Sequence, residues 1–239
     1  MTNPMEHFEL HTLIQISLFG IDISINEAVV MMWIVVIVVF GLFWIVSQRV
    51  RPIPGRLQNL VEIVIEFLKD MIRQNMGEAG LVFLPFLSSL FLFILFCNLL
   101  GLVPGAYTAT SQLIVTGSIA VLVSLVSLGV GFARHGMKIF VPPGAPLWLL
   151  PFLIPIEVIS QLIRPFSLAI RLFANMTAGH TILAVMFGFV ITLKLYIAWL
   201  PLGFTVFLSA FEIVIALFQA YIFTLLASTY IGEAIQQHE

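Results

Sequence analysis

The sequence predicts an all-α polytopic membrane protein with about five transmembrane helices and one amphipathic helix at the membrane interface. The first observation is composition: of 239 residues, 61% are hydrophobic and only 9% are charged. A soluble domain carries about 25% charged residues, so this chain has too few to cover an aqueous surface. The second observation is the spacing of the charges. It leaves uncharged runs long enough to cross a bilayer, which takes about 20 residues each.

Residues 1–27 are predicted to lie on the periplasmic side. This segment contains acidic and histidine side chains but neither Lys nor Arg. Because cytoplasmic loops carry an excess of basic residues, we expect this segment to lie outside the cytoplasm. Because a secretory signal peptide needs a basic start, we expect the segment to stay on the mature protein. Residues 28–46 have no charge and form the first expected span.

Basic residues mark the cytoplasmic ends of the spans. Arg49, Arg51 and Arg56 follow the first span, and Arg134 and Lys138 follow the third. Between them, residues 56–76 place apolar side chains at helical spacing opposite a stripe of Glu62, Glu66, Lys69 and Arg73. We expect an amphipathic helix lying along the interface there.

Residues 81–133 are predicted to form a helical hairpin. No charged residue occurs from 79 to 133, which is too long for one span and suits two. Glycine, proline and polar residues between 101 and 112 supply the turn. An odd number of spans then puts the C-terminus in the cytoplasm.

Residues 147–233 form the last expected hairpin, and ionisable residues interrupt both of its apolar stretches. A charge inside a span costs roughly 2.5–3.5 kcal/mol on insertion scales and by default marks a functional pathway. Helical steps of three and four place several polar residues on one face of the first stretch, with Arg171 about 21 Å from Glu157 at ~1.5 Å per residue. These residues are Glu157, Ser160, Arg164, Ser167, Arg171 and Asn175.

A second polar group faces elsewhere. His180 lies nine residues beyond Arg171, about 180° round a helix that turns about 100° per residue. On the last helix, Thr205, Ser209, Glu212 and Gln219 also keep helical spacing. We therefore expect Glu212 and His180 to be partners across the hairpin.

The chemistry of these side chains suggests two half-paths for protons, separated by a fixed charge. A guanidinium stays protonated, so Arg171 is a poor proton carrier but can attract a carboxylate and block a moving proton. Glu157, His180 and Glu212 can change protonation in the accessible range. Each of these residues also has a purely structural alternative. Arg164 would reach lipid phosphates, His180 would bond to a backbone carbonyl, the two glutamates would be interhelical hydrogen-bond partners, and Arg171 would be an ion-pair partner.

The run from Arg164 to His180, RPFSLAIRLFANMTAGH, resembles the signature of subunit a of the F-type ATP synthase, with its Arg-Leu-x-x-Asn-Met-x-x-Gly core. Glu157 and Gln219 stand at the family's acidic and glutamine positions, and residues 98–104 (NLLGLVP) are also similar. In the enterobacterial pattern of this family, the position nine after the arginine is acidic and the last helix carries a histidine. His180 and Glu212 stand the other way round, which resembles the alphaproteobacterial and mitochondrial branch. Gly101 replaces the enterobacterial acid of the first hairpin.

The resemblance implies a tilted last hairpin that packs against a ring of c subunits. It also implies that the peripheral stalk subunits b or b′ are partners of the chain. Arg171 would face the carboxylate of each passing c subunit. Asn175, His180, Glu212 and Gln219 would line the periplasmic half-channel, and Glu157 with Ser160 the cytoplasmic one. The implied role is a non-catalytic proton-translocating subunit of the ATP synthase complex, embedded in membrane lipid.

Two other classes of function are alternatives. A small secondary transporter using its intramembrane charges would usually show internal repeats, which this sequence lacks. A passive assembly subunit has little reason to concentrate titratable residues in one hairpin. No Walker A loop is present, so ATP chemistry is expected on partner chains. No free basic cluster suggests nucleic acid, and we expect no cofactor and no metal site.

Overall fold

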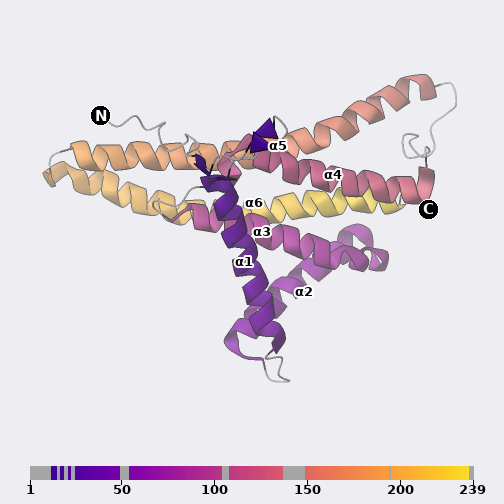
Figure 1. Cartoon of the computed structure of the whole chain (residues 1–239), viewed down its shortest axis with the longest axis horizontal. Coiled ribbons are helices and arrows are strands. Elements are labelled where there is room, and N and C mark those ends of the chain that lie inside the picture. Colours follow the sequence, from indigo (N-terminus) through magenta and orange to yellow (C-terminus); the bar gives the residue numbers. More distant parts are fainter. Residues whose placement is uncertain are drawn as a thin grey trace.

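The computed structural model describes residues 12–14, 17–18, 21–22, 25–48, 54–103, 108–136, 149–193 and 195–236. Residues 1–11, Arg49, Arg51 and Lys138, on which part of the expected topology rests, lie outside these ranges. The described helices are α1 (Glu27–Gln48), α2 (Arg56–Met76), the 3-10 helix η2 (Glu78–Phe83), α3 (Leu84–Gly101), the 3-10 helix η3 (Ala109–Ser111), α4 (Leu113–His135), α5 (Leu150–Thr192) and α6 (Leu195–Gln236) (Figure 1).

The predicted fold class, an all-α polytopic membrane protein, is confirmed. Within the described residues, five helical segments are long and apolar enough to cross a membrane: α1, η2 with α3, α4, α5 and α6. The remaining helix, α2, is amphipathic. It buries Val61, Leu68 and Ile72 on one side while its charged residues lie on another.

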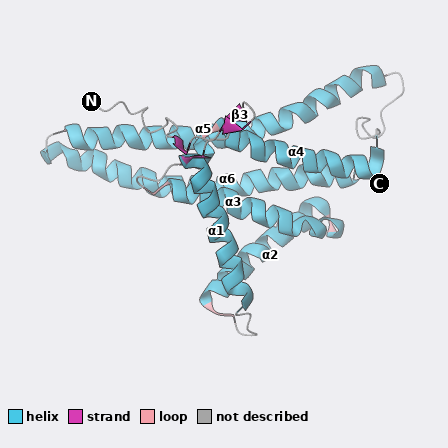
Figure 2. Ribbon diagram, in the orientation of Figure 1, coloured by secondary structure: helices cyan, strands magenta, loops and turns pink. Residues whose placement is uncertain are grey.

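Four short strands precede α1, and the sequence does not predict them. Strand β1 (Thr12–Ile14) pairs with β4 (Ile25–Asn26), and β2 (Ser17–Leu18) pairs with β3 (Ile21–Asp22), both antiparallel. Figure 2 shows them near the N-terminal end of α1. Strands of two or three residues leave the all-α class unchanged.

The last two helices are much longer than a membrane is thick. Helix α5 has 43 residues and α6 has 42. At ~1.5 Å per residue each measures about 63–65 Å, roughly twice the ~30 Å hydrocarbon core. A hydrophobic helix longer than the local bilayer thickness is accommodated by tilting, by kinking or by local thickening of the bilayer. In Figure 1 they run alongside α3 and α4, whereas α1 crosses their direction steeply.

The core lies around the C-terminal half of α6, which contacts α2, α3, α4 and α5. Small buried residues on α6, such as Ala220 and Ala227, let neighbouring helices approach closely, as is usual in membranes. Large apolar side chains of α1 and of the outer faces of α5 and α6 remain exposed in the isolated chain. Helices α5 and α6 thus have one face packed against the other helices and one exposed apolar face.

Candidate functional site

Arg171 is exposed on the side of α5 that faces away from the core. Its neighbours Leu168 and Leu172 are buried against the bundle, while Ile170 and Arg171 itself are exposed. The ion pairs found in the described part of the chain join Arg73 to Glu78 and Arg164 to Glu233, so no carboxylate there neutralises Arg171. The guanidinium is therefore an uncompensated charge that is available to a partner.

Glu157 and Ser160 lie further back along α5, and both are half-buried. The Gln161 amide donates a hydrogen bond of 3.3 Å to Glu157 Oε1. This contact is local to one helix turn. Glu157 thus does not join α5 to a neighbouring helix through a hydrogen bond seen in the described residues.

Arg164 makes a contact that differs from the lipid-facing reading of the sequence. Its Nη1 lies 2.8 Å from Glu233 Oε2 of α6, and its guanidinium stacks over the Tyr230 ring, 4.8 Å from the centroid. Arg164 therefore ties α5 to the end of α6. Sequence reasoning missed Glu233, because a charge in the last turn of a helix does not stand out as a buried one does.

Asn175 and Gln219 are brought together by the fold. Asn175 Nδ2 donates to Gln219 Oε1 over 2.8 Å, and the Gln219 side chain is 3% exposed. Their positions are 44 residues apart in sequence. The bond fixes the relative position of α5 and α6 one turn beyond Arg171.

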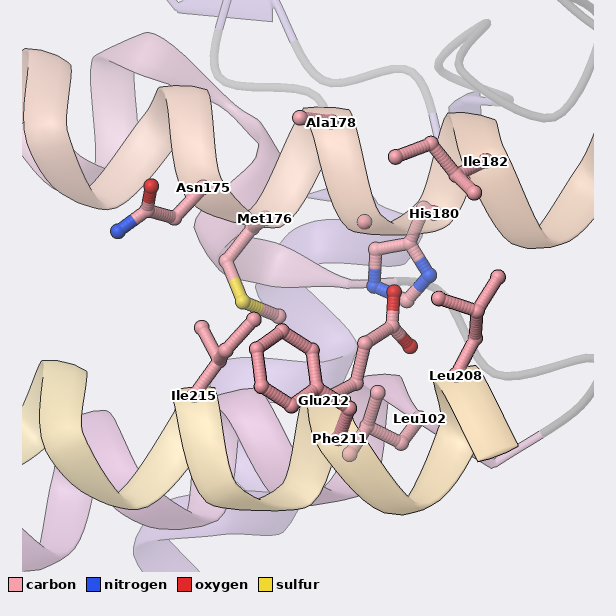
Figure 3. Close-up of a pocket in the computed structure, with 11 residues that line it drawn as sticks. Leu102, Asn175, Met176, Ala178, His180, Ile182, Leu208, Phe211, Glu212 and Ile215 are labelled. Carbon is pink, nitrogen blue, oxygen red and sulfur yellow. The ribbon is translucent and has the colours of Figure 1, made fainter. Parts of the chain in front are cut away.

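His180 and Glu212 line one cavity of about 200 Å³, lying between α5 and α6. Figure 3 shows both side chains pointing into the same space. At about 30 Å³ per molecule, this volume holds several waters. Other lining residues are Leu102, Asn175, Met176, Gly179, Phe211 and Ile215.

The hydrogen bond of His180 goes to Thr108, a residue that the sequence analysis did not single out. Thr108 Oγ1 lies 2.8 Å from His180 Nε2 and also donates to the Gly101 carbonyl over 3.3 Å. His180 is thus held by a hydroxyl rather than by a backbone carbonyl. No pattern in the sequence signals this contact, because 72 positions separate the two residues.

Glu212 is 9% exposed, and its Oε2 has no hydrogen-bond partner in the described part of the chain. Its Oε1 lies against Gly179, where any side chain would collide with it. Buried polar atoms are nearly always hydrogen-bonded, and an exception calls for a functional explanation. Glu212 is therefore a carboxylate held in an apolar wall of the cavity, and it does not serve as an interhelical hydrogen-bond partner through Oε2.

The described residues contain no group of three or more His, Cys, Asp or Glu side chains arranged to hold a metal ion. The site contains one permanent cation, Arg171, and three ionisable side chains, Glu157, His180 and Glu212. Fold and site together define a class, a polytopic membrane protein with ionisable groups enclosed in its longest hairpin.

Comparison with known proteins identifies the family. The family model of the ATP synthase A chain matches residues 29–232. The chain is also 44% identical over 244 aligned positions to ATP synthase subunit a of Magnetococcus marinus, covering 99% of this chain and 94% of that relative. The chain therefore belongs to the ATP synthase A chain family, which confirms the resemblance seen in the Arg164–His180 run.

Proposed function

We propose that this chain is the proton-conducting stator of the membrane sector of an F-type ATP synthase. The observation that carries the proposal is the position of Arg171. It is an exposed cation without a partner in the described chain, and it lies on α5 between Glu157 and the cavity of His180 and Glu212. A membrane protein has reason to keep such a charge when a carboxylate on another chain passes in front of it.

In this mechanism Arg171 separates two half-channels. Asn175, His180, Glu212 and Gln219 form the periplasmic half-channel, where the cavity admits water between the helices. Glu157 and Ser160 border the cytoplasmic one. Arg171 attracts the ionised carboxylate of a c subunit and stops a proton from crossing directly, so each proton travels by way of the ring.

The energy comes from the membrane potential and the proton gradient. Moving one charge through 100 mV supplies about 2.3 kcal/mol. Because the two half-channels are offset along α5, a proton enters the ring at one position and leaves at another. The ring must rotate to complete the transfer, which couples proton flow to ATP synthesis on other subunits. The chain itself is not the catalyst.

The proposal names as partners a ring of c subunits and the peripheral stalk subunits b or b′, within the whole ATP synthase complex and its lipids. An affinity tag on this chain tests it directly. A mild-detergent preparation should contain the c-ring and support ATP hydrolysis. If the tagged chain is isolated without any ring, and vesicles containing it alone accumulate a small solute, the secondary-transporter reading replaces the stator.

We also propose a bacterial inner-membrane location with the N-terminus periplasmic and the C-terminus cytoplasmic, supported by the basic residues at 49, 51, 56, 134 and 138. Cys97 is the one cysteine and is buried, so a Cys97→Ala chain gives a clean background for labelling. Cysteine introduced at position 5 should react only from the periplasmic side. Reaction from the cytoplasm would show the topology inverted.

Gly179→Ala is expected to lower the ATP-synthesis rate severalfold. A Cβ at this position would overlap Glu212 Oε1, so the carboxylate must leave its place in the cavity wall. The loss cannot come from a weaker helix, because Ala favours a helix over Gly by about 0.5–1 kcal/mol. The matched control is Gly188→Ala on the same helix, where the added Cβ would meet no other described segment within 4 Å. Equal rates for the two variants would show that the position of Glu212 is unimportant.

A further inference from the structure

We propose that Thr108 is a positioning residue for His180, holding the imidazole with its Nε2 protonated and directing it into the cavity. The inference rests on the proposed function, since it concerns the periplasmic half-channel. Thr108 comes just before η3, is 6% exposed and reaches α5 through its hydroxyl.

The first argument counts protons. A threonine hydroxyl has one hydrogen to donate and two lone pairs that accept. Thr108 Oγ1 donates to the Gly101 carbonyl over 3.3 Å and lies 2.8 Å from His180 Nε2. Both bonds form together only when Nε2–H of His180 is the donor to Thr108. Nδ1 is then the nitrogen that takes up and releases a proton.

The second argument is that Thr108 is held firmly in this role. Ser111 Oγ donates to the Thr108 carbonyl over 2.7 Å. The next polar residue of the segment, Thr110, donates to Asn98 Oδ1 of α3 over 2.8 Å. All of these side chains are buried, so the segment is anchored to α3 and cannot turn its hydroxyl away from α5 without breaking buried hydrogen bonds.

The third argument comes from Gly101. A Cβ at this position would lie 2.5 Å from Thr108 Oγ1 and 2.7 Å from Thr108 Cγ2, closer than atoms can approach. Only glycine therefore lets Thr108 reach both the Gly101 carbonyl and His180. Gly101 thus makes room for the Thr108 hydroxyl.

The bond is useful whether His180 is neutral or charged. An imidazolium donates from both nitrogens, so Nε2–H can stay bonded to Thr108 while the proton on Nδ1 comes and goes. The ring keeps its orientation through each transfer, and the facing titratable group, Glu212 of α6, lines the same cavity. Among the described residues between α3 and η3, Leu102 lines the cavity and Thr108 contacts His180, and neither side chain carries a charge.

The activity test compares Thr108→Val with Thr108→Ser in the whole ATP synthase. Valine keeps the shape but removes the acceptor, and we expect the ATP-synthesis rate per assembled complex to fall about tenfold, in line with the loss of a hydrogen bond to a charged group. Serine should restore most of the rate. Thr224→Val is the matched control: it removes a buried hydroxyl that donates to the Ala220 carbonyl within α6 and is not part of the segment that holds Thr108, so the rate per assembled complex should stay near that of the parent. Equal losses in Thr108→Val and Thr224→Val would overturn the proposal.

A second readout does not depend on activity. Solid-state 15N spectroscopy of the complex with labelled histidine reads the tautomer of His180, whose signal is identified by its loss in His180→Gln. The neutral ring should carry its proton on Nε2 in the parent and lose this preference in Thr108→Val. A neutral ring protonated on Nδ1 in the parent would show that Thr108 donates instead, which overturns the inference but leaves the stator function intact.

Discussion

Arg171→Ala is expected to abolish ATP-driven proton pumping into inverted membrane vesicles while the chain remains assembled in the membrane. Without the fixed cation, nothing attracts the ionised carboxylate of the passing c subunit, and nothing separates the two half-channels. Because Arg171 is exposed and has no ion-pair partner in the described chain, its removal breaks no internal salt bridge. Loss of function should therefore occur without loss of the protein.

The controls separate the charge of Arg171 from its shape and from arginine loss in general. Arg171→Lys keeps a cation but loses the planar guanidinium, and it should retain only part of the activity. Arg73→Ala removes an arginine from the α2 end, where Arg73 Nε lies 3.0 Å from Glu78 Oε1 on an exposed surface, and should pump normally. Normal pumping by Arg171→Ala, measured as dye quenching after ATP addition, would end the separator role.

The fold class could be predicted from the sequence because the bilayer imposes a simple rule. Backbone polar groups must be satisfied inside the membrane, so long uncharged runs become helices whatever their neighbours are. Helix α1 and the α3–α4 hairpin follow from this rule alone. The short strands β1 to β4 do not, because they lie outside the long apolar runs. Their pairing depends on contacts between residues 11 to 14 positions apart for β1 with β4, and 3 to 5 positions apart for β2 with β3.

The candidate site was predictable only in part, for a geometric reason. Helical periodicity tells which residues share a face, and it placed Glu157 and Arg171 on one side of α5. It does not tell which residue of another segment meets that face. Three contacts escaped it for this reason: His180 with Thr108, Arg164 with Glu233, and Asn175 with Gln219. Thr108 and Glu233 also lie at the ends of apolar segments, where a polar residue is common and carries little signal.

Exchanging His180 and Glu212 is expected to show that the two act as one unit. His180→Glu places two carboxylates beside the cavity, and Glu212→His places two imidazoles there; in each case like charges disfavour joint ionisation. Each single variant should therefore lose most of the proton entry from the periplasm. The double variant restores one acid and one imidazole, so it should recover part of the ATP-synthesis rate, with a coupling of about 0.5–3 kcal/mol between the two sites. Recovery should be partial for two reasons. Gly179 leaves room for the carboxylate of Glu212, and Thr108 bonds to the imidazole of His180, so the exchanged side chains lose these neighbours.

The measurement is the ATP-synthesis rate against external pH for the parent, both single variants and the double variant. The matched control combines His180→Glu with Glu78→His, which changes a carboxylate that is paired with Arg73 and does not line the cavity. Distant sites are independent, so this control pair should show simple additivity of its effects on the logarithm of the rate. Additive damage in the His180–Glu212 pair as well would refute the pairing. Arg171 and Glu157 would keep their roles in that case, because neither takes part in the exchange.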